Sequence, residues 1–376
     1  VGEGVRVVRM KTYVLCDNYY DGEEKSIVVL PRHQRLVRSK PLRIEGRSSV
    51  KLDMEKLGEG GDNFVLELTS NPVWYVVMAL PYIMEREYES MDEKFLRYYS
   101  NSIARHIIKE YPEIKDVFDS WKRFYGDALK SELEKNIELK SVRLDMTPWV
   151  EEAEDERESR LRLANYFDDN RIDYELANIV KQIKSGQNND GSWGWFKGGA
   201  GDRNITQYIL YKFVQLYKLG LVDIKKEKEL YELIVKGVSW LDRENSKDYD
   251  RIMKYESNDI KGEYLSYDNI QYLYIRTVLN SVLSNKQYKG VYDYFMGQCR
   301  KQWVKRDRYE QGLIALIMYN IGDKDLSRKI LRSLKEYAII NKSKGIYWKD
   351  SEGYARSIIT GGEFQSLMAD VFSSMD

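Results

Sequence analysis

The chain has 376 residues, and 60 Lys and Arg balance 60 Asp and Glu, so the formal net charge is zero. A neutral chain gives no support for long-range steering toward nucleic acid or an anionic membrane. The length fits one large domain or two, and no apolar run approaches the roughly 18 residues that a membrane span needs. The first residues, VGEGVRVVRMK, lack the apolar core of a signal peptide, so we expect a segment of a longer protein.

The first 70 residues have the pattern of β-strands. Short runs rich in β-branched residues occur at 5–15, 25–31, 42–46 and 63–69. Polar segments that favour turns, DNYYDGE among them, separate these runs. The sequence therefore predicts a β portion from Val1 to about Ser70.

From Asn71 onward, apolar residues recur near the 3.6-residue period of a helix. The predicted helical runs are 73–84, 92–111, 158–167, 174–184, 205–219, 230–241, 268–283, 309–321 and 327–340. A final helix is predicted from about Gly362 to Met375, with one apolar face made of Phe364, Leu367, Met368, Val371 and Phe372. No helical hairpin follows it, so we expect this face to be partly exposed or covered by a neighbouring molecule.

The most informative stretch is GQNNDGSWGWFKGGAGDRNIT, residues 186–206. Its Asn and Asp side chains can accept hydrogen bonds from the turn backbone, and its glycines allow positive φ. We expect this loop to join two helices, with Trp193 and Trp195 as structural aromatic residues packed between them. Residues 345–372 repeat the layout loosely, with a Gly, a Trp, a Gly-rich loop and a new helix.

This turn resembles the Q-x-x-D-G-x-W turns of α/α toroids, in which helical hairpins stack in a ring. Triterpene cyclases, protein prenyltransferase β subunits and thioester domains share that fold. The preceding segment is similar to the start of the thioester domain in bacterial α2-macroglobulin-like proteins. The matching positions are Asn71, Pro72, Trp74, Leu80, Pro81 and Tyr82, then Phe95, Arg97, Tyr98, Tyr99, Asn101 and Ala104. The segments DGEEKSIVVLP and TPWVEEAEDERE resemble further parts of the same family, in the same order.

The resemblance implies a mainly helical fold. Residues 1–70 would be strands of an adjoining macroglobulin or CUB-like β domain, itself incomplete. Residues 71–376 would be an α/α toroid, truncated at its C-terminal end. The parent protein would be a periplasmic or cell-surface-anchored protease inhibitor of the cell envelope. Its partners would be target proteases and adjoining β-sandwich domains, without nucleic acid or direct membrane contact in this segment.

The thioester box is degenerate in this chain. Thioester-bearing members carry Cys-x-Glu-Gln, in which the thiol condenses with the Gln amide. Here Ser90, Met91, Asp92 and Glu93 stand at those positions. A carboxylate is a poor electrophile toward a serine hydroxyl, and no base that could activate the hydroxyl is visible nearby, so we predict an inactive box and no enzymatic activity. Cys16 and Cys299 are expected to be buried or free thiols.

The alternative is an α/α-toroid enzyme acting on a polysaccharide or isoprenoid. A prenyltransferase zinc site is not expected, because His33 and His106 are the only histidines. Asp168, Asp169 and Asp173 do not match a cyclase acid and are expected to flank a helix start. The acidic run 151–158 reads as a solvated face or linker. We therefore expect no cofactor and no metal, and opposed carboxylates in a deep cleft would favour the enzyme.

Overall fold

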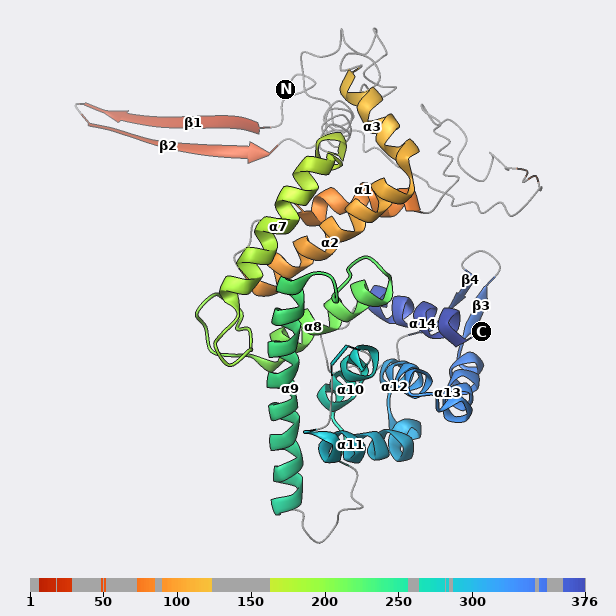
Figure 1. Cartoon of the computed structure of the whole chain (residues 1–376). Helices are drawn as coiled ribbons and strands as arrows, with labels where there is room; N and C mark the ends of the chain where they lie inside the picture. Colours follow the sequence, from red (N-terminus) through yellow and green to blue (C-terminus); the bar gives the residue numbers. More distant parts are fainter. Residues whose placement is uncertain are drawn as a thin grey trace. The chain divides into compact units, whose positions relative to one another are not determined.

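The computed structural model describes residues 7–17, 19–28, 49, 51, 73–84, 90–123, 163–255, 264–280, 282–283, 287–341, 345–349 and 361–375. Within these residues the protein is mainly helical, with a small two-stranded sheet near the N-terminus (Figure 1). The chain divides into two compact units, Val1–Trp74 with Glu113–Tyr166, and Tyr75–Pro112 with Phe167–Asp376. The mainly helical fold that the sequence predicts is confirmed.

In the first unit, β1 (Val7–Cys16) pairs antiparallel with β2 (Tyr19–Val28). Cys16 is opposite Tyr19, so a two-residue connection closes the hairpin, and Asp17 in it has a φ of 48°. The predicted turn DNYYDGE was therefore too long, because its residues from Tyr19 onward belong to β2. The predicted strands at 42–46 and 63–69 lie outside the described residues.

The β1–β2 hairpin has little core of its own. Five of its apolar side chains are between 63 and 83% exposed, namely Tyr13, Val14, Leu15, Tyr19 and Tyr20. An isolated two-stranded hairpin is marginally stable in water. In the same unit the rings of Trp74 and Phe118 stack, with their centroids 6.0 Å apart. Trp74 belongs to α1 (Val73–Met84) and Phe118 to α3 (Pro112–Arg123), a helix that the sequence pattern did not predict.

The second unit holds the remaining helices. Their bounds are α2 Met91–Glu110, α7 Asp169–Gly186, α8 Arg203–Lys218, α9 Lys228–Tyr255, α10 Tyr267–Leu279, α11 Lys289–Gln302, the 3-10 turn η1 Trp303–Lys305, α12 Arg308–Asn320, α13 Lys324–Glu336 and α14 Gly361–Met375. Two short strands, β3 (Ile339–Asn341) and β4 (Gly345–Tyr347), form a hairpin before α14. The predicted helix 327–340 was thus too long, since its last two residues start β3.

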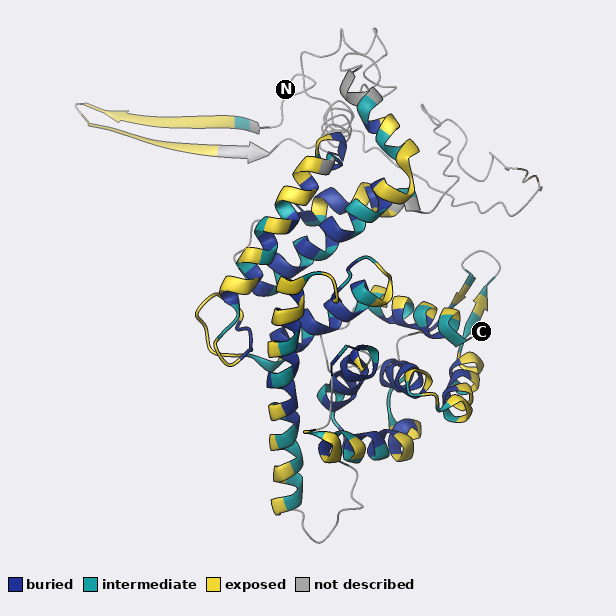
Figure 2. Cartoon of the chain, viewed as in Figure 1, coloured by how far each residue is buried: buried dark blue, intermediate teal, exposed yellow. Residues whose placement is uncertain are grey.

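The helices of this unit alternate between two environments. α2, α8, α10, α12 and α14 contact one another in succession along the chain, while α7 packs on α2, α9 on α8, α11 on α10 and α13 on α12. Helices of the first set, such as α10 and α12, are buried on nearly every face (Figure 2). Those of the second set bury one stripe, as α13 does with Ser327, Ile330, Leu331 and Leu334. This division follows from the sequence, because α13 is amphipathic whereas α12 carries the apolar run GLIALIM.

Short polar side chains begin several of these helices. Asp168, Asp202, Ser266, Asp307 and Asp323 each accept a hydrogen bond from a backbone N–H in the first turn of the helix that follows. Such caps satisfy donors that have no partner within the helix, and each contributes about 1 kcal/mol. The starts of α7, α8, α10, α12 and α13 are therefore fixed by local sequence.

The apolar face of α14 is buried, which contradicts the expectation that it would be left uncovered. Phe364, Leu367, Met368 and Val371 are between 0 and 5% exposed. α14 packs against α12 and α13 of the same chain, and the ring of Phe372 lies 5.1 Å from that of Trp348. Helices that precede α14 in the chain thus cover this face.

None of the helices in the described part of the chain is both long enough and apolar enough to cross a membrane.

Candidate functional site

The degenerate box lies at the start of α2. Ser90 is the N-cap residue, with extended backbone, and its carbonyl accepts from Lys94 N–H at 3.1 Å. Met91 is fully buried. It packs so closely on α7 that a Cβ at Gly186 would lie 1.9 Å from the Met91 methyl carbon. Asp92 and Glu93 occupy the first turn of the helix, where negative charge complements the helix dipole.

Neither cysteine of the chain stands at the box. Cys16 is exposed on β1, whereas Cys299 is fully buried in α11. Burial raises the pKa of the Cys299 thiol to about 12. A thiol with such a pKa is almost wholly protonated at neutral pH, and the protonated form is a poor nucleophile.

Trp193 is a fully buried anchor of the aromatic turn. Its indole Nε1 donates to the carbonyl of Ile183, in the last turn of α7, at 3.0 Å. Its backbone N–H donates to Thr206 Oγ1 of α8 at 2.9 Å, and that hydroxyl donates back to the Trp193 carbonyl at 3.2 Å. Trp193 therefore joins the end of α7, through its indole, to the start of α8, through its backbone.

Trp195 differs from the expectation of an aromatic residue packed between two helices, because its side chain is 50% exposed. The next residue, Phe196, is 59% exposed. The contact that Trp195 makes to the box is through its backbone, since Met91 N–H donates to the Trp195 carbonyl at 2.8 Å. Residues two apart share a face only in a strand, and this loop forms a single isolated β-bridge, between Gln187 and Trp193, so the spacing does not place the two tryptophans on one face.

Polar side chains of the turn hold its backbone, as the sequence indicated. Asp190 accepts from the Ser192 N–H at 3.0 Å and hydroxyl at 2.6 Å, and from the indole Nε1 of Trp240 at 3.1 Å. Burial alone would raise the pKa of Asp190, but these hydrogen bonds and the charge of Arg243 lower it. Gly191 has a φ of 95°, and a Cβ there would lie 2.3 Å from the carbonyl oxygen of Lys236, so this position requires glycine.

A second tryptophan repeats the arrangement at the other end of the helical unit. Trp348 donates its Nε1 to the carbonyl of Leu334, in the last turn of α13, at 2.7 Å. The amide of Gln365 in α14 bonds both backbone groups of Trp348, at 3.2 and 2.7 Å. In both turns the indole N–H donates a hydrogen bond to a carbonyl in the last turn of the preceding helix. A polar side chain near the start of the next helix bonds the backbone N–H and carbonyl of the tryptophan. The loose repeat seen in the sequence thus corresponds to a shared set of hydrogen bonds.

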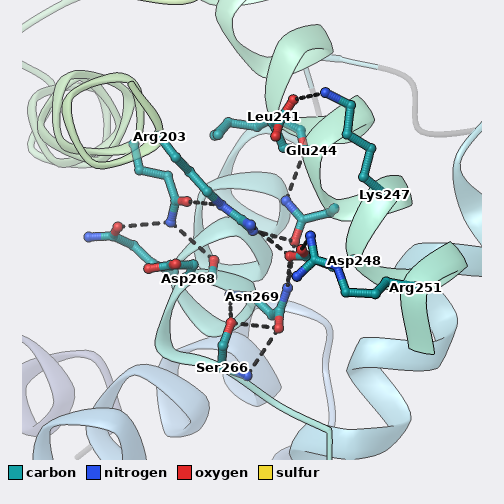
Figure 3. A network of polar contacts seen from close by, with 12 residues as sticks. Arg203, Leu241, Glu244, Lys247, Asp248, Arg251, Ser266, Asp268 and Asn269 are labelled. Atoms are coloured by element: carbon teal, nitrogen blue, oxygen red, sulfur yellow. Dashed lines mark hydrogen bonds and ion pairs between the residues drawn. The ribbon is translucent and has the colours of Figure 1, made fainter. Parts of the chain in front are cut away.

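A polar network joins the starts of α8 and α10 to the C-terminal half of α9 (Figure 3). Arg203 of α8 donates to Asp248 Oδ2 at 2.6 Å and to Asn245 Oδ1 at 3.2 Å. Asn269 of α10 donates to the same two residues, at 3.2 and 2.9 Å, and also forms a capping box with Ser266. Arg203 and Asp248 each have about a fifth of their side chain exposed, and Asn245 is fully buried. Because these groups satisfy one another, the network positions three helices.

The remaining candidate residues fall at helix ends or outside the described part. Asp168 caps α7 by accepting from Arg171 N–H at 3.2 Å, and Asp169 is the first residue of that helix. Oδ1 of Asp173 lies 3.8 Å from Nη1 of Arg105 on α2. His106 is on α2, while His33 and the acidic run 151–158 lie outside the described residues. Among the residues that the structure describes, no three His, Cys, Asp or Glu gather where they could hold a metal ion.

No protein-family model matches the chain. A search of curated proteins gave no significant match either.

Proposed function

We propose that the chain is a fragment of a bacterial α2-macroglobulin-like protein of the thioester-free type, with endopeptidase inhibitor activity in the periplasm or cell envelope. The observation that carries this proposal is the box itself. Ser90 and Glu93 stand at the start of α2, where thioester-bearing members have Cys and Gln, and Met91 contacts the aromatic turn through the Trp195 carbonyl. Ser90 has no thiol and Glu93 has no side-chain amide, so the two groups that form a thioester are both absent from the box.

The proposal includes an α/α toroid for the helical unit. Three features support it: the alternation of mutually contacting and peripheral helices, the succession from α2 to α14, and the two tryptophan turns with matching hydrogen bonds. The ion pairs Lys212–Glu363, at 3.5 Å, and Lys218–Asp370, at 2.6 Å, also link α14 to α8. Such a unit offers packing surfaces instead of covalent capture, and the exposed β1–β2 hairpin suits contact with an adjoining β domain.

A first test is reaction with methylamine, which opens thioesters. We expect the intact mass to stay unchanged after incubation, with no adduct on the peptide that contains residues 90–93. A positive control is the variant Ser90→Cys/Glu93→Gln, which restores the two reactive side chains at the box. A stoichiometric adduct on the unmodified chain would overturn the thioester-free part of the proposal.

The inhibitory function needs a test on the full-length parent protein. After cleavage by an endopeptidase, the trapped protease should still hydrolyse a small chromogenic peptide but lose activity on a large protein substrate. Equal activity on both substrates would remove the inhibitor proposal, and turnover of a polysaccharide or an isoprenoid diphosphate would favour the enzyme instead.

A further inference from the structure

The strand β1 has one edge that pairs with no other described strand. Among the described residues, its sheet consists of β1 and β2 alone (Figure 1). A free strand edge pairs readily with another strand unless proline, charged side chains, a bulge or a covering segment blocks it. β1 contains no proline, its pairing with β2 is continuous from Val7 to Cys16, and its only charged residues are Arg9 and Lys11. These features suit the edge to a further strand.

Uncharged side chains form a continuous row on one face of β1. Alternate residues of a strand point to the same face, which places together Val8, Met10, Thr12, Val14 and Cys16. Of these, Met10 and Val14 are 51 and 66% exposed. The row therefore presents apolar surface beside a free edge.

The two cations of β1 lie on its other face, where β2 offsets their charge. Nζ of Lys11 lies 2.8 Å from the carboxylate of Glu24, and Nη1 of Arg9 lies 3.8 Å from the same group. The pairing of β1 with β2 places Glu24 directly opposite Lys11. The positive charge of β1 is thus partly neutralised within the hairpin.

A second copy of β1 fits this edge. A two-fold axis perpendicular to the sheet pairs a strand antiparallel with its own copy and keeps each row of side chains on its own face. Centred on Thr12, this pairing sets Met10 opposite Val14 of the copy and Lys11 opposite Tyr13 of the copy. The remaining opposed pairs are Val8 with Cys16 and Arg9 with Leu15. No like charges are opposed in this register.

The neighbouring registers are less suitable. Centring the pairing on Lys11 sets two lysines directly opposite each other, which is destabilising. Centring it on Tyr13 leaves Val8 and Arg9 without an opposed residue of the copied strand, so the overlap is shorter. The register centred on Thr12 combines the longest overlap with the absence of like-charge pairs.

The outer edge of β2 does not allow the same pairing. The middle of this strand carries Asp21, Glu23, Glu24 and Lys25. A two-fold pairing centred on position 21, 23, 24 or 25 sets a charged residue opposite itself, and one centred on position 22 sets Asp21 opposite Glu23. Like charges directly opposite are destabilising, so β1 is the edge that suits a second copy.

We propose that two copies of this chain associate through antiparallel pairing of β1 with β1, centred on Thr12. The product is a four-stranded sheet in the order β2, β1, β1, β2. A sheet of this size supplies the third and fourth strands that an isolated hairpin lacks for stability in water. The inference goes beyond the proposed function and does not depend on it, because an adjoining β-sandwich domain packs on a face of the hairpin, whereas the copy uses its edge.

Sedimentation velocity of the complete chain measures the association. Contacts along one strand edge form a small interface, so we expect a reversible dimer with a dissociation constant of about 1–100 μM. Val14→Lys puts a charge into the uncharged row twice per dimer and should weaken association by about tenfold or more. The matched control is Tyr20→Lys, at a similarly exposed position on β2, which should leave association unchanged. A chain that stays monomeric up to about 200 μM, or a dimer weakened as much by Tyr20→Lys as by Val14→Lys, overturns the proposal.

Cysteine substitution tests the register. Directly opposite residues have Cα atoms about 4.5–5.5 Å apart, within reach of a disulfide, whereas diagonal neighbours are about 7–8 Å apart. In the Cys16→Ser background, Thr12→Cys should form a disulfide-linked dimer on mild oxidation, whereas Lys11→Cys and Tyr13→Cys should not. These side chains are exposed, so the changes should not disturb the helical unit, which circular dichroism checks. Absence of a link at position 12, or equal linking at all three positions, overturns the proposal.

Discussion

Replacing Trp193 by alanine should lower the free energy of unfolding of the helical unit by about 3–5 kcal/mol, the range for deleting a large buried aromatic side chain. The structure indicates the upper part of this range. The side chain is fully buried, and its indole is the donor to the Ile183 carbonyl at 3.0 Å. Removing the indole also leaves the buried Ile183 carbonyl without its donor, which costs about 1–3 kcal/mol. The variant Trp193→Phe loses the same donor but keeps most of the packing, so this cost should dominate there.

The packing of Trp193 against α9 gives this prediction a sharper form. A Cβ on Gly237 would lie 2.8 Å from Cζ3 of Trp193 and 3.2 Å from the methyl carbons of Leu210. Gly237→Ala should therefore destabilise the unmodified chain by roughly 1–3 kcal/mol through overpacking. In the Trp193→Ala background the indole is absent, so the same change should cost less, or stabilise by up to about 1 kcal/mol through helix propensity.

Urea unfolding followed by circular dichroism measures all four members of this cycle. We expect a coupling energy of at least about 1 kcal/mol between positions 193 and 237. The matched control is Trp195→Ala, which should cost under about 1 kcal/mol because that ring is half exposed. Equal effects of Gly237→Ala in both backgrounds, or equal costs at Trp193 and Trp195, would refute the reasoning.

Two further predictions concern titratable groups. The pKa of Asp190 is lowered in the folded protein, so its contribution to stability is present above the unfolded value of about 3.9 and is lost as the pH falls through the lower folded value. In urea unfolding series between pH 5 and 2, Asp190→Asn should therefore show a shallower loss of stability than the unmodified chain, and an unchanged slope would contradict this. With Ellman's reagent at pH 8, Cys16 should react at once, whereas Cys299, whose pKa is raised to about 12 by burial, should react only after denaturation. Cys16→Ser should abolish the fast reaction, and any rapid labelling left in that variant would show that Cys299 is accessible.

Local sequence patterns predicted most helix positions and the hydrogen-bonding residues of the aromatic turn. Periodic apolar residues predicted α1 with its bounds and α8 to within two residues, because packing of one helix face needs only the local pattern. Asp190 and Gly191 were identifiable as turn residues, because a carboxylate acceptor and positive φ are local requirements. The helix α11 was missed, since Gly297 interrupts the apolar pattern VYDYFMGQC and Gly290 directly precedes it.

Which side chains are buried, and which of them contact one another, depends on how the helices pack. Trp193 and Trp195 look equivalent in sequence, yet one is enclosed by α7, α8 and α9 and the other is half exposed. The apolar residues of α14 did not indicate which helices would cover them. In the structure α12 and α13 pack against this face. Lys212 and Glu363 are 151 residues apart and meet only after α14 docks. A local pattern specifies that a face or a charge needs a partner, but the choice of partner depends on how distant helices pack, which the pattern does not encode.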